Sequence, residues 1–154
     1  MNKTWFIDID GTLVRHLENE EIDEGREEEL LPNALEFMEG IQKRGDYIIL
    51  TTARLERHRL ITINMLEDFG IKYDHIIFGI GSQERIVIND TKPINAYDGG
   101  DRRNPLPTAY AINMERNEGF TRVLSKDLWE RPINAKEKVF DLFDLKWFYS
   151  EEMG

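Results

Sequence analysis

The feature that most constrains the fold is an alternation of short apolar segments with segments of helical periodicity. Residues 3–9 and 46–53 are nearly continuous runs rich in aromatic and β-branched side chains, which is typical of buried strands. Residues 31–45 and 56–70 repeat apolar side chains at helical spacing. This alternation predicts an α/β protein built on a parallel sheet, in three layers with helices on both faces.

Individual residues set the expected bounds of the helices. Pro32 fits the first helical turn, and Gly45 and Gly70 are placed to end the two helices. The residues expected in their apolar stripes are Leu35, Met38 and Ile41 in the first helix, and Leu60, Ile63 or Asn64, and Leu66 or Glu67 in the second. Further strands are expected at 75–79, 85–90 and 108–114, and a further helix at 134–149.

Length and composition narrow the class of protein. A chain of 154 residues with 40% hydrophobic residues is expected to form a single domain, 1–154, with its own core. The absence of cysteine excludes disulfides and thiolate sites. A net charge of -10 argues against a nucleic-acid partner, and no apolar run is long enough to cross a membrane. We expect a cytoplasmic protein, whose acidic segment 18–30 is a solvated loop and helix start.

Polar side chains stand where three of the expected strands end. Asp8 and Asp10 close the first strand, Thr51 and Thr52 close the second, and Asp90 closes the strand expected at 85–90. Ligands of parallel sheets bind beyond the carboxyl ends of the strands, so these ends are expected to converge on one crevice.

The two neighbouring carboxylates need a cation between them. Asp8 and Asp10 are two residues apart and would repel each other, so one would be protonated unless a cation lay between them. Mg²⁺ prefers oxygen ligands and leaves room for a phosphate, and Asp90 would be a third acidic ligand. The plainer interpretation is that Asp10-Gly11-Thr12 is a tight turn. A binding site is favoured over a simple turn, because this motif ends one expected strand and two further expected strands also end in polar residues.

Three motifs resemble those of the haloacid dehalogenase (HAD) superfamily of phosphohydrolases. They are "DIDGTLV" at 8–14, "IILTTAR" at 48–54 and "IVINDTKP" at 86–93. The resemblance covers about residues 3–95, and leaves 96–154 as an unassigned extension of the same domain. It implies a Rossmann-like HAD fold without a separate cap domain, because only residues 16–30 are left to form a modest flap.

The resemblance also implies roles for individual residues. Asp8 would be the nucleophile that forms an aspartyl-phosphate, and Asp10 the general acid and then the base. Thr52, rather than Thr51, would hydrogen-bond the phosphate, since adjacent strand residues face opposite ways. The residues expected to bind phosphate are Gly11, Thr12, Thr52, Arg54 and Lys92. The expected Mg²⁺ ligands are Asp8, the Asp10 carbonyl and Asp90.

The chain departs from the family at the lysine that normally steadies the nucleophile and the phosphate. Residues 78–85, where related small members carry it, contain none. Lys92 is our choice of replacement, with a solvated loop residue as the alternative. Arg85 and Lys72 are expected at the far edge of the sheet. Arg54 is either a phosphate contact or a surface charge, and Asn89 either supports the site or caps a turn.

Together these features predict a Mg²⁺-dependent phosphatase that hydrolyses a small phosphorylated metabolite, such as a sugar phosphate. The alternative is a non-catalytic module that binds a phosphoryl ligand or a protein on the same fold. A phosphotransferase is a third option. Capless relatives often shield their sites by oligomerising, so a homo-oligomer is also expected.

Overall fold

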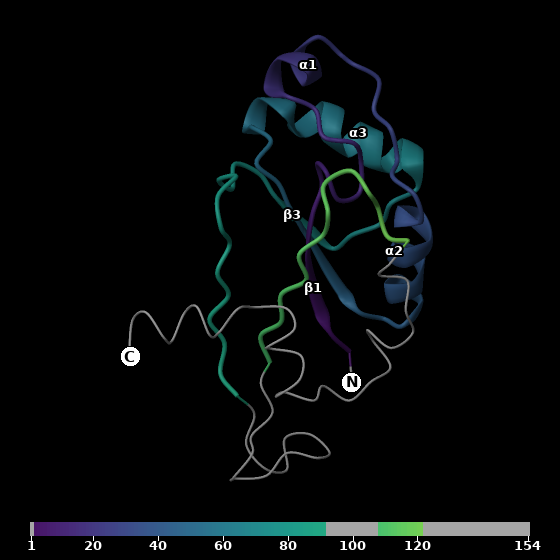
Figure 1. Cartoon of the computed structure of the whole chain (residues 1–154). Coiled ribbons are helices and arrows are strands. Elements are labelled where there is room, and N and C mark those ends of the chain that lie inside the picture. Colours follow the sequence, from purple (N-terminus) through teal and green to yellow (C-terminus); the bar gives the residue numbers. More distant parts are fainter. Residues whose placement is uncertain (1, 92–107, 122–154) are drawn as a thin grey trace. The chain divides into compact units, whose positions relative to one another are not determined.

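The computed structural model describes residues 2–91 and 108–121 (Figure 1). The chain forms two compact units, and their positions relative to one another are not determined. The first unit is Met1–Glu84 with Met114–Leu128, and the second is Arg85–Asn113 with Trp129–Gly154. All described helices and strands lie in the first unit. They are β1 (Thr4–Asp8), α1 (Asn19–Asp23), α2 (Ala34–Lys43), β2 (Tyr47–Thr51), the 3-10 helix η1 (Glu56–His58), α3 (Arg59–Phe69) and β3 (His75–Ile77).

The strands form a parallel sheet in the order β1-β2-β3. The α/β class and the parallel sheet expected from the sequence are therefore confirmed. Each pair of neighbouring strands is joined by a helical crossover, α2 between β1 and β2, and α3 between β2 and β3. Because the strands run in one direction, their carboxyl ends lie at one edge, where Asp8 pairs in register with Thr51 and Thr51 with Ile77.

The core lies between the sheet and α2. The Trp5 ring of β1 meets Phe37 of α2 edge-on at 5.5 Å between ring centroids, and Phe37 stacks on Phe120 at 4.4 Å. The opposite side of the sheet is more open, since Phe6 is 57% exposed and Ile77 is 46% exposed. This alternation follows from the strand period of two, which sends neighbouring side chains to opposite faces.

Both helices end at the expected glycines. Gly45 and Gly70 have φ of 79° and 76°, in the left-handed region that glycine occupies at little cost. The expected apolar stripes are confirmed at Met38, Ile41 and Leu66, which are buried, and need correction at other positions. Pro32 precedes α2, Leu35 is only half-buried, and Leu60 is 71% exposed. The buried positions of the two helices are Ala34, Phe37, Met38, Ile41, Thr62, Met65 and Leu66.

Two expected strands are absent from the described structure. Residues 85–90 and 108–114 have no regular secondary structure, so both of these predictions are wrong. Ile86 and Ile88 are 82% and 93% exposed. β-branched residues favour a strand only where the strand can pair with a sheet and bury its side chains. The helix predicted at 134–149 lies outside the described residues. None of the helices in the described part of the chain is both long and apolar enough to cross a membrane.

Candidate functional site

The candidate site lies at the carboxyl edge of the sheet, where β1 and β2 end side by side. Asp8 and Thr51 are register partners, so both side chains belong to the same face of the sheet. Thr52, one residue further, is fully buried, and its Oγ1 accepts a hydrogen bond of 3.0 Å from the main-chain N–H of Arg54. The strand register thus brings Thr51 next to Asp8, while Thr52 fixes the turn that follows β2.

A tight loop follows β1 and carries the glycine of the first motif. Gly11 has a φ of 81° and its N–H donates to the carbonyl of Val14 at 2.7 Å. The N–H of Thr12 donates to the carbonyl of Ile9 at 3.2 Å. The main-chain N–H groups of Gly11 and Thr12, two residues expected to bind phosphate, are thus used within the loop.

Arg54 is the centre of a buried ionic cluster. Its guanidinium is 2% exposed and binds both carboxylate oxygens of Asp10, at 2.8 and 2.9 Å. It also binds both oxygens of Glu28 and donates to Thr62 Oγ1 at 3.0 Å. We call Asp10, Glu28, Arg54 and Thr62 the Arg54 cluster. The alternative that Arg54 is a surface charge is wrong.

The Arg54 cluster uses every N–H donor of the guanidinium. Nε donates to Asp10, Nη1 to Glu28 and Thr62, and Nη2 to Asp10 and Glu28. Burial alone would lower the pKa of Arg54, but the hydrogen bonds to Asp10 and Glu28 raise it above its ordinary value. Arg54 therefore stays charged, and a phosphate reaches it only by displacing one of these protein contacts.

Glu28 is a residue that sequence reasoning missed. It lies in the acidic segment 18–30, where a run of glutamates is usually solvated. Nothing in the sequence distinguishes Glu28 from its neighbours, because its partner Arg54 is 26 residues away. Its contact fastens the acidic segment to the loop after β2.

A second ionic contact fastens the same segment. Asp23, at the end of α1, accepts hydrogen bonds from Arg57 at 2.9 Å and from His58 Nε2 at 2.5 Å. His58 is buried, and its ring belongs to η1. The acidic segment is thus held at both Glu28 and Asp23 against the residues that follow β2.

The Asp23 contact predicts a measurable pH dependence. The hydrogen bonds from Arg57 and His58 lower the pKa of Asp23 from 3.8 to about 2. A carboxylate whose pKa is lower in the folded state stabilises the fold above pH 3.8, and this stabilisation is lost as the pH falls through about 2. We expect a carboxyl NMR titration of Asp23 with a midpoint near 2 in the native protein, and a higher midpoint in Arg57→Gln. An unchanged midpoint in that variant would contradict the contact.

Three other residues considered from the sequence do not belong to the described part of the first unit. Asp90 belongs to the second unit, as does Asn89, whose side-chain amide donates to Thr108 Oγ1 at 2.7 Å. The Thr108 hydroxyl in turn donates to the main-chain carbonyl of Asp90. Asn89 thus joins two stretches of the second unit. Lys92 lies outside the described residues.

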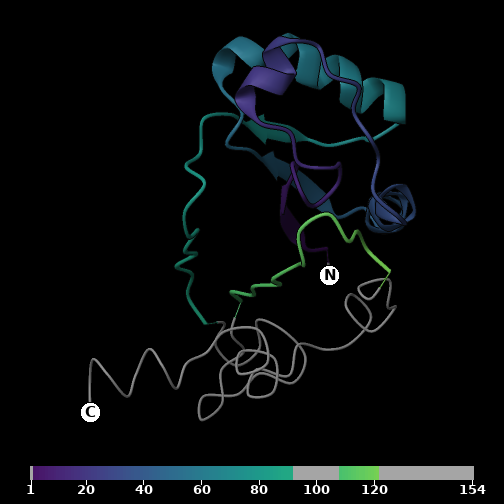
Figure 2. The same ribbon diagram turned by 45° about the horizontal axis from the view of Figure 1, so that its top comes forward.

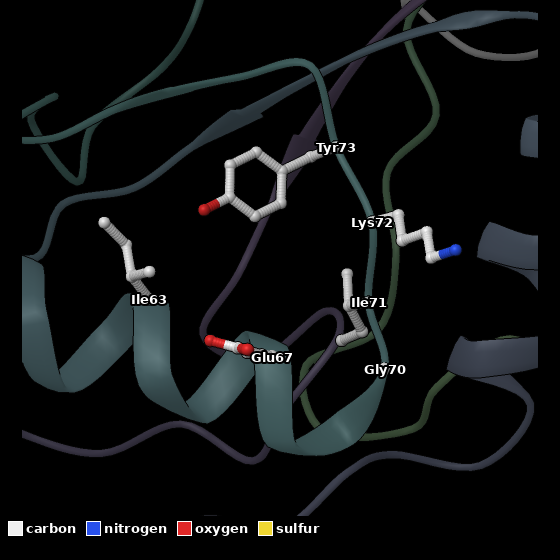
Figure 3. A pocket seen from close by; sticks show the side chains of 6 residues that line it. All are labelled: Ile63, Glu67, Gly70, Ile71, Lys72 and Tyr73. Carbon is white, nitrogen blue, oxygen red and sulfur yellow. The ribbon is translucent and has the colours of Figure 1, made fainter.

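No cluster of three or more histidine, aspartate or glutamate side chains suited to a metal ion occurs within residues 2–91 and 108–121. A depression of about 290 Å³ lies at the end of α3 (Figure 3). It is lined by Ile63, Glu67, Gly70, Ile71, Lys72 and Tyr73. These residues lead into the start of β3, so the depression belongs to the amino edge of the sheet.

Comparison of the chain with protein-family models, with curated proteins and with solved structures finds no match.

Proposed function

We propose that the chain is a HAD-like, Mg²⁺-dependent phosphatase that hydrolyses a small phosphorylated metabolite. One observation carries the proposal: the "DIDGT" motif places Asp8 at the carboxyl end of a parallel strand, beside Thr51 at the end of the next. Ligands of parallel sheets bind at such an edge. The proposal includes a single three-layer domain without a cap, in which a further layer would cover the exposed Phe6 and Ile77.

In the proposed reaction Asp8 is the nucleophile, and Asp10 is the general acid and then the general base. In the first step an Asp8 oxygen forms a bond to phosphorus while the bond to the leaving oxygen breaks, and Asp10 gives that oxygen its proton. In the second step water attacks phosphorus, Asp10 accepts the proton of the water, and the bond to Asp8 breaks. Since Arg54 binds both oxygens of Asp10, a proton on Asp10 replaces one of the Arg54 contacts.

Two oxygen donors at this edge suit a hard divalent cation, whereas the Asp10 side chain is held by Arg54. The Asp8 carboxylate at the end of β1 and the Asp10 carbonyl two residues later are oxygen donors, and Asp90 is the proposed third ligand. The side chain of Asp10 is already bound by Arg54, so the main-chain carbonyl is the Asp10 group that we assign to the metal. When bound, Mg²⁺ supplies positive charge that stabilises the phosphoryl oxygens.

The direct test is hydrolysis of a chromogenic phosphate monoester. We expect turnover with Mg²⁺, loss of turnover when a chelator removes the metal, and recovery when Mg²⁺ is restored. The unfolding temperature, measured under the same conditions, controls for loss of structure. A panel of phosphorylated sugars and nucleotides then ranks substrates. Equal background rates with and without the metal across this panel would contradict the phosphatase.

The second candidate function is a non-catalytic module that binds a phosphoryl ligand or a protein. Arg54 favours it, because a guanidinium that binds both oxygens of Asp10 restrains the acid that must exchange a proton. A binder retains affinity for inorganic phosphate while showing no turnover on any ester. The same panel, combined with a phosphate titration, separates the two functions.

A further inference from the structure

A distant part of the chain returns to the loop that follows β1. Figures 1 and 2 both show the stretch 114–121, in green, beside that loop and near α2. The N–H of Asn117 donates to the carbonyl of Gly11 at 2.9 Å, and Asn117 Oδ1 accepts from the N–H of His16 at 2.8 Å. The N–H of Phe120 donates to the Pro32 carbonyl at 2.9 Å. These contacts fix the stretch on the first motif.

Arg116 is brought over Gly11 by these contacts. A Cβ atom built on Gly11 would lie 3.1 Å from Arg116 Cγ and 3.9 Å from its Nε. Only glycine combines this close approach with a φ of 81°. The loop glycine of the motif therefore also makes room for the arginine side chain.

Arg116 differs from Arg54 in being available to a ligand. Arg116 is exposed, and no carboxylate of residues 2–91 and 108–121 forms an ion pair with it. Arg54, by contrast, is buried with every N–H donor taken by the protein. Of these two arginines near the motif, only Arg116 is able to donate hydrogen bonds without breaking others.

A second guanidinium suits the charge of the site. Asp10 and Glu28 carry two negative charges against the one positive charge of Arg54. A phosphate monoester brings further negative charge to the same edge. A guanidinium matches two phosphate oxygens with two parallel N–H donors, which makes arginine well suited to this task.

We propose that Arg116 contacts the phosphoryl group and takes the place of the lysine that the motifs lack. The proposal rests on the phosphatase function and names a residue more than twenty positions beyond the last motif. Arg116 donates hydrogen bonds to the oxygens of the substrate phosphate, while Gly11 provides the space for its side chain. Lys92 is then not needed for this role.

The test is a calorimetric titration of the protein with inorganic phosphate in the presence of Mg²⁺. We compare the native chain with Arg116→Ala, Arg116→Lys and Lys72→Ala. Lys72 is a matched control, because it removes a positive charge at the amino edge of the sheet. We expect affinity to fall about tenfold or more in Arg116→Ala, to fall less in Arg116→Lys, and to stay unchanged in Lys72→Ala.

The outcomes separate this inference from the proposed function. Phosphate affinity that depends on Arg116 in a chain without turnover supports the inference and contradicts the phosphatase. Turnover that requires Asp8 but is unchanged in Arg116→Ala, with unchanged phosphate affinity, overturns the inference and leaves the phosphatase intact. A native chain that does not bind phosphate overturns the inference as well. The unfolding temperature of each variant shows whether the fold is kept, and Arg116→Lys provides a second reading if Arg116→Ala fails to fold.

Discussion

Asp8→Asn is expected to reduce the turnover of a chromogenic phosphate ester by at least about 10³-fold, because asparagine lacks the nucleophilic oxygen that forms the bond to phosphorus. Asparagine keeps the size of the side chain at the carboxyl end of β1, so the sheet register with Thr51 should survive. The measurement is the initial rate with saturating Mg²⁺. The unfolding temperature measured in parallel tests that the fold is retained.

The matched control for this prediction is Asp68→Asn. Asp68 is an exposed carboxylate of α3, and its replacement changes the net charge by the same amount without touching the carboxyl edge. We expect native turnover from Asp68→Asn. Turnover of Asp8→Asn within tenfold of the native rate would show that hydrolysis does not depend on this carboxylate, and would contradict the assigned nucleophile.

The sequence alone predicts the strands β1 and β2, the ends of the two long helices and the edge of the sheet at which the candidate site lies. β1 and β2 are continuous apolar runs, and Gly45 and Gly70 mark helix ends, because these signals depend on a few adjacent residues. The strand predicted at 85–90 failed for the converse reason. Its β-branched residues have the right propensity, but a strand also requires a partner, which no short segment specifies.

The contacts that sequence reasoning missed are all between distant residues. The sequence predicts Arg54 as a phosphate contact or a surface charge, whereas its burial depends on Asp10 and Glu28, which are 44 and 26 residues away. Likewise, His16 and Asn117 are separated by 101 residues. Charge patterns along the chain do not encode such pairs. The motif at the end of β1 predicts where the candidate site lies. The ion pairs around Arg54 are visible only in the structure.

Arg54→Ala is expected to lower the free energy of unfolding by about 3–5 kcal/mol, the usual effect of removing one partner from a buried ion pair. The Asp10 and Glu28 side chains are 13% and 10% exposed, so both carboxylates would be left poorly solvated and close to each other. Thr62 also loses its donor. Chemical denaturation at neutral pH measures this change.

The control for Arg54→Ala is Arg57→Ala, which breaks an ion pair whose partners are 57% and 43% exposed. Exposed pairs contribute about 1 kcal/mol or less, so this variant should change the free energy of unfolding far less. Adding Glu28→Gln to Arg54→Ala removes one of the unpaired charges and should recover part of the lost stability. Equal effects of Arg54→Ala and Arg57→Ala, with no recovery from Glu28→Gln, would mean that the Arg54 cluster does not hold the acidic segment against the sheet edge.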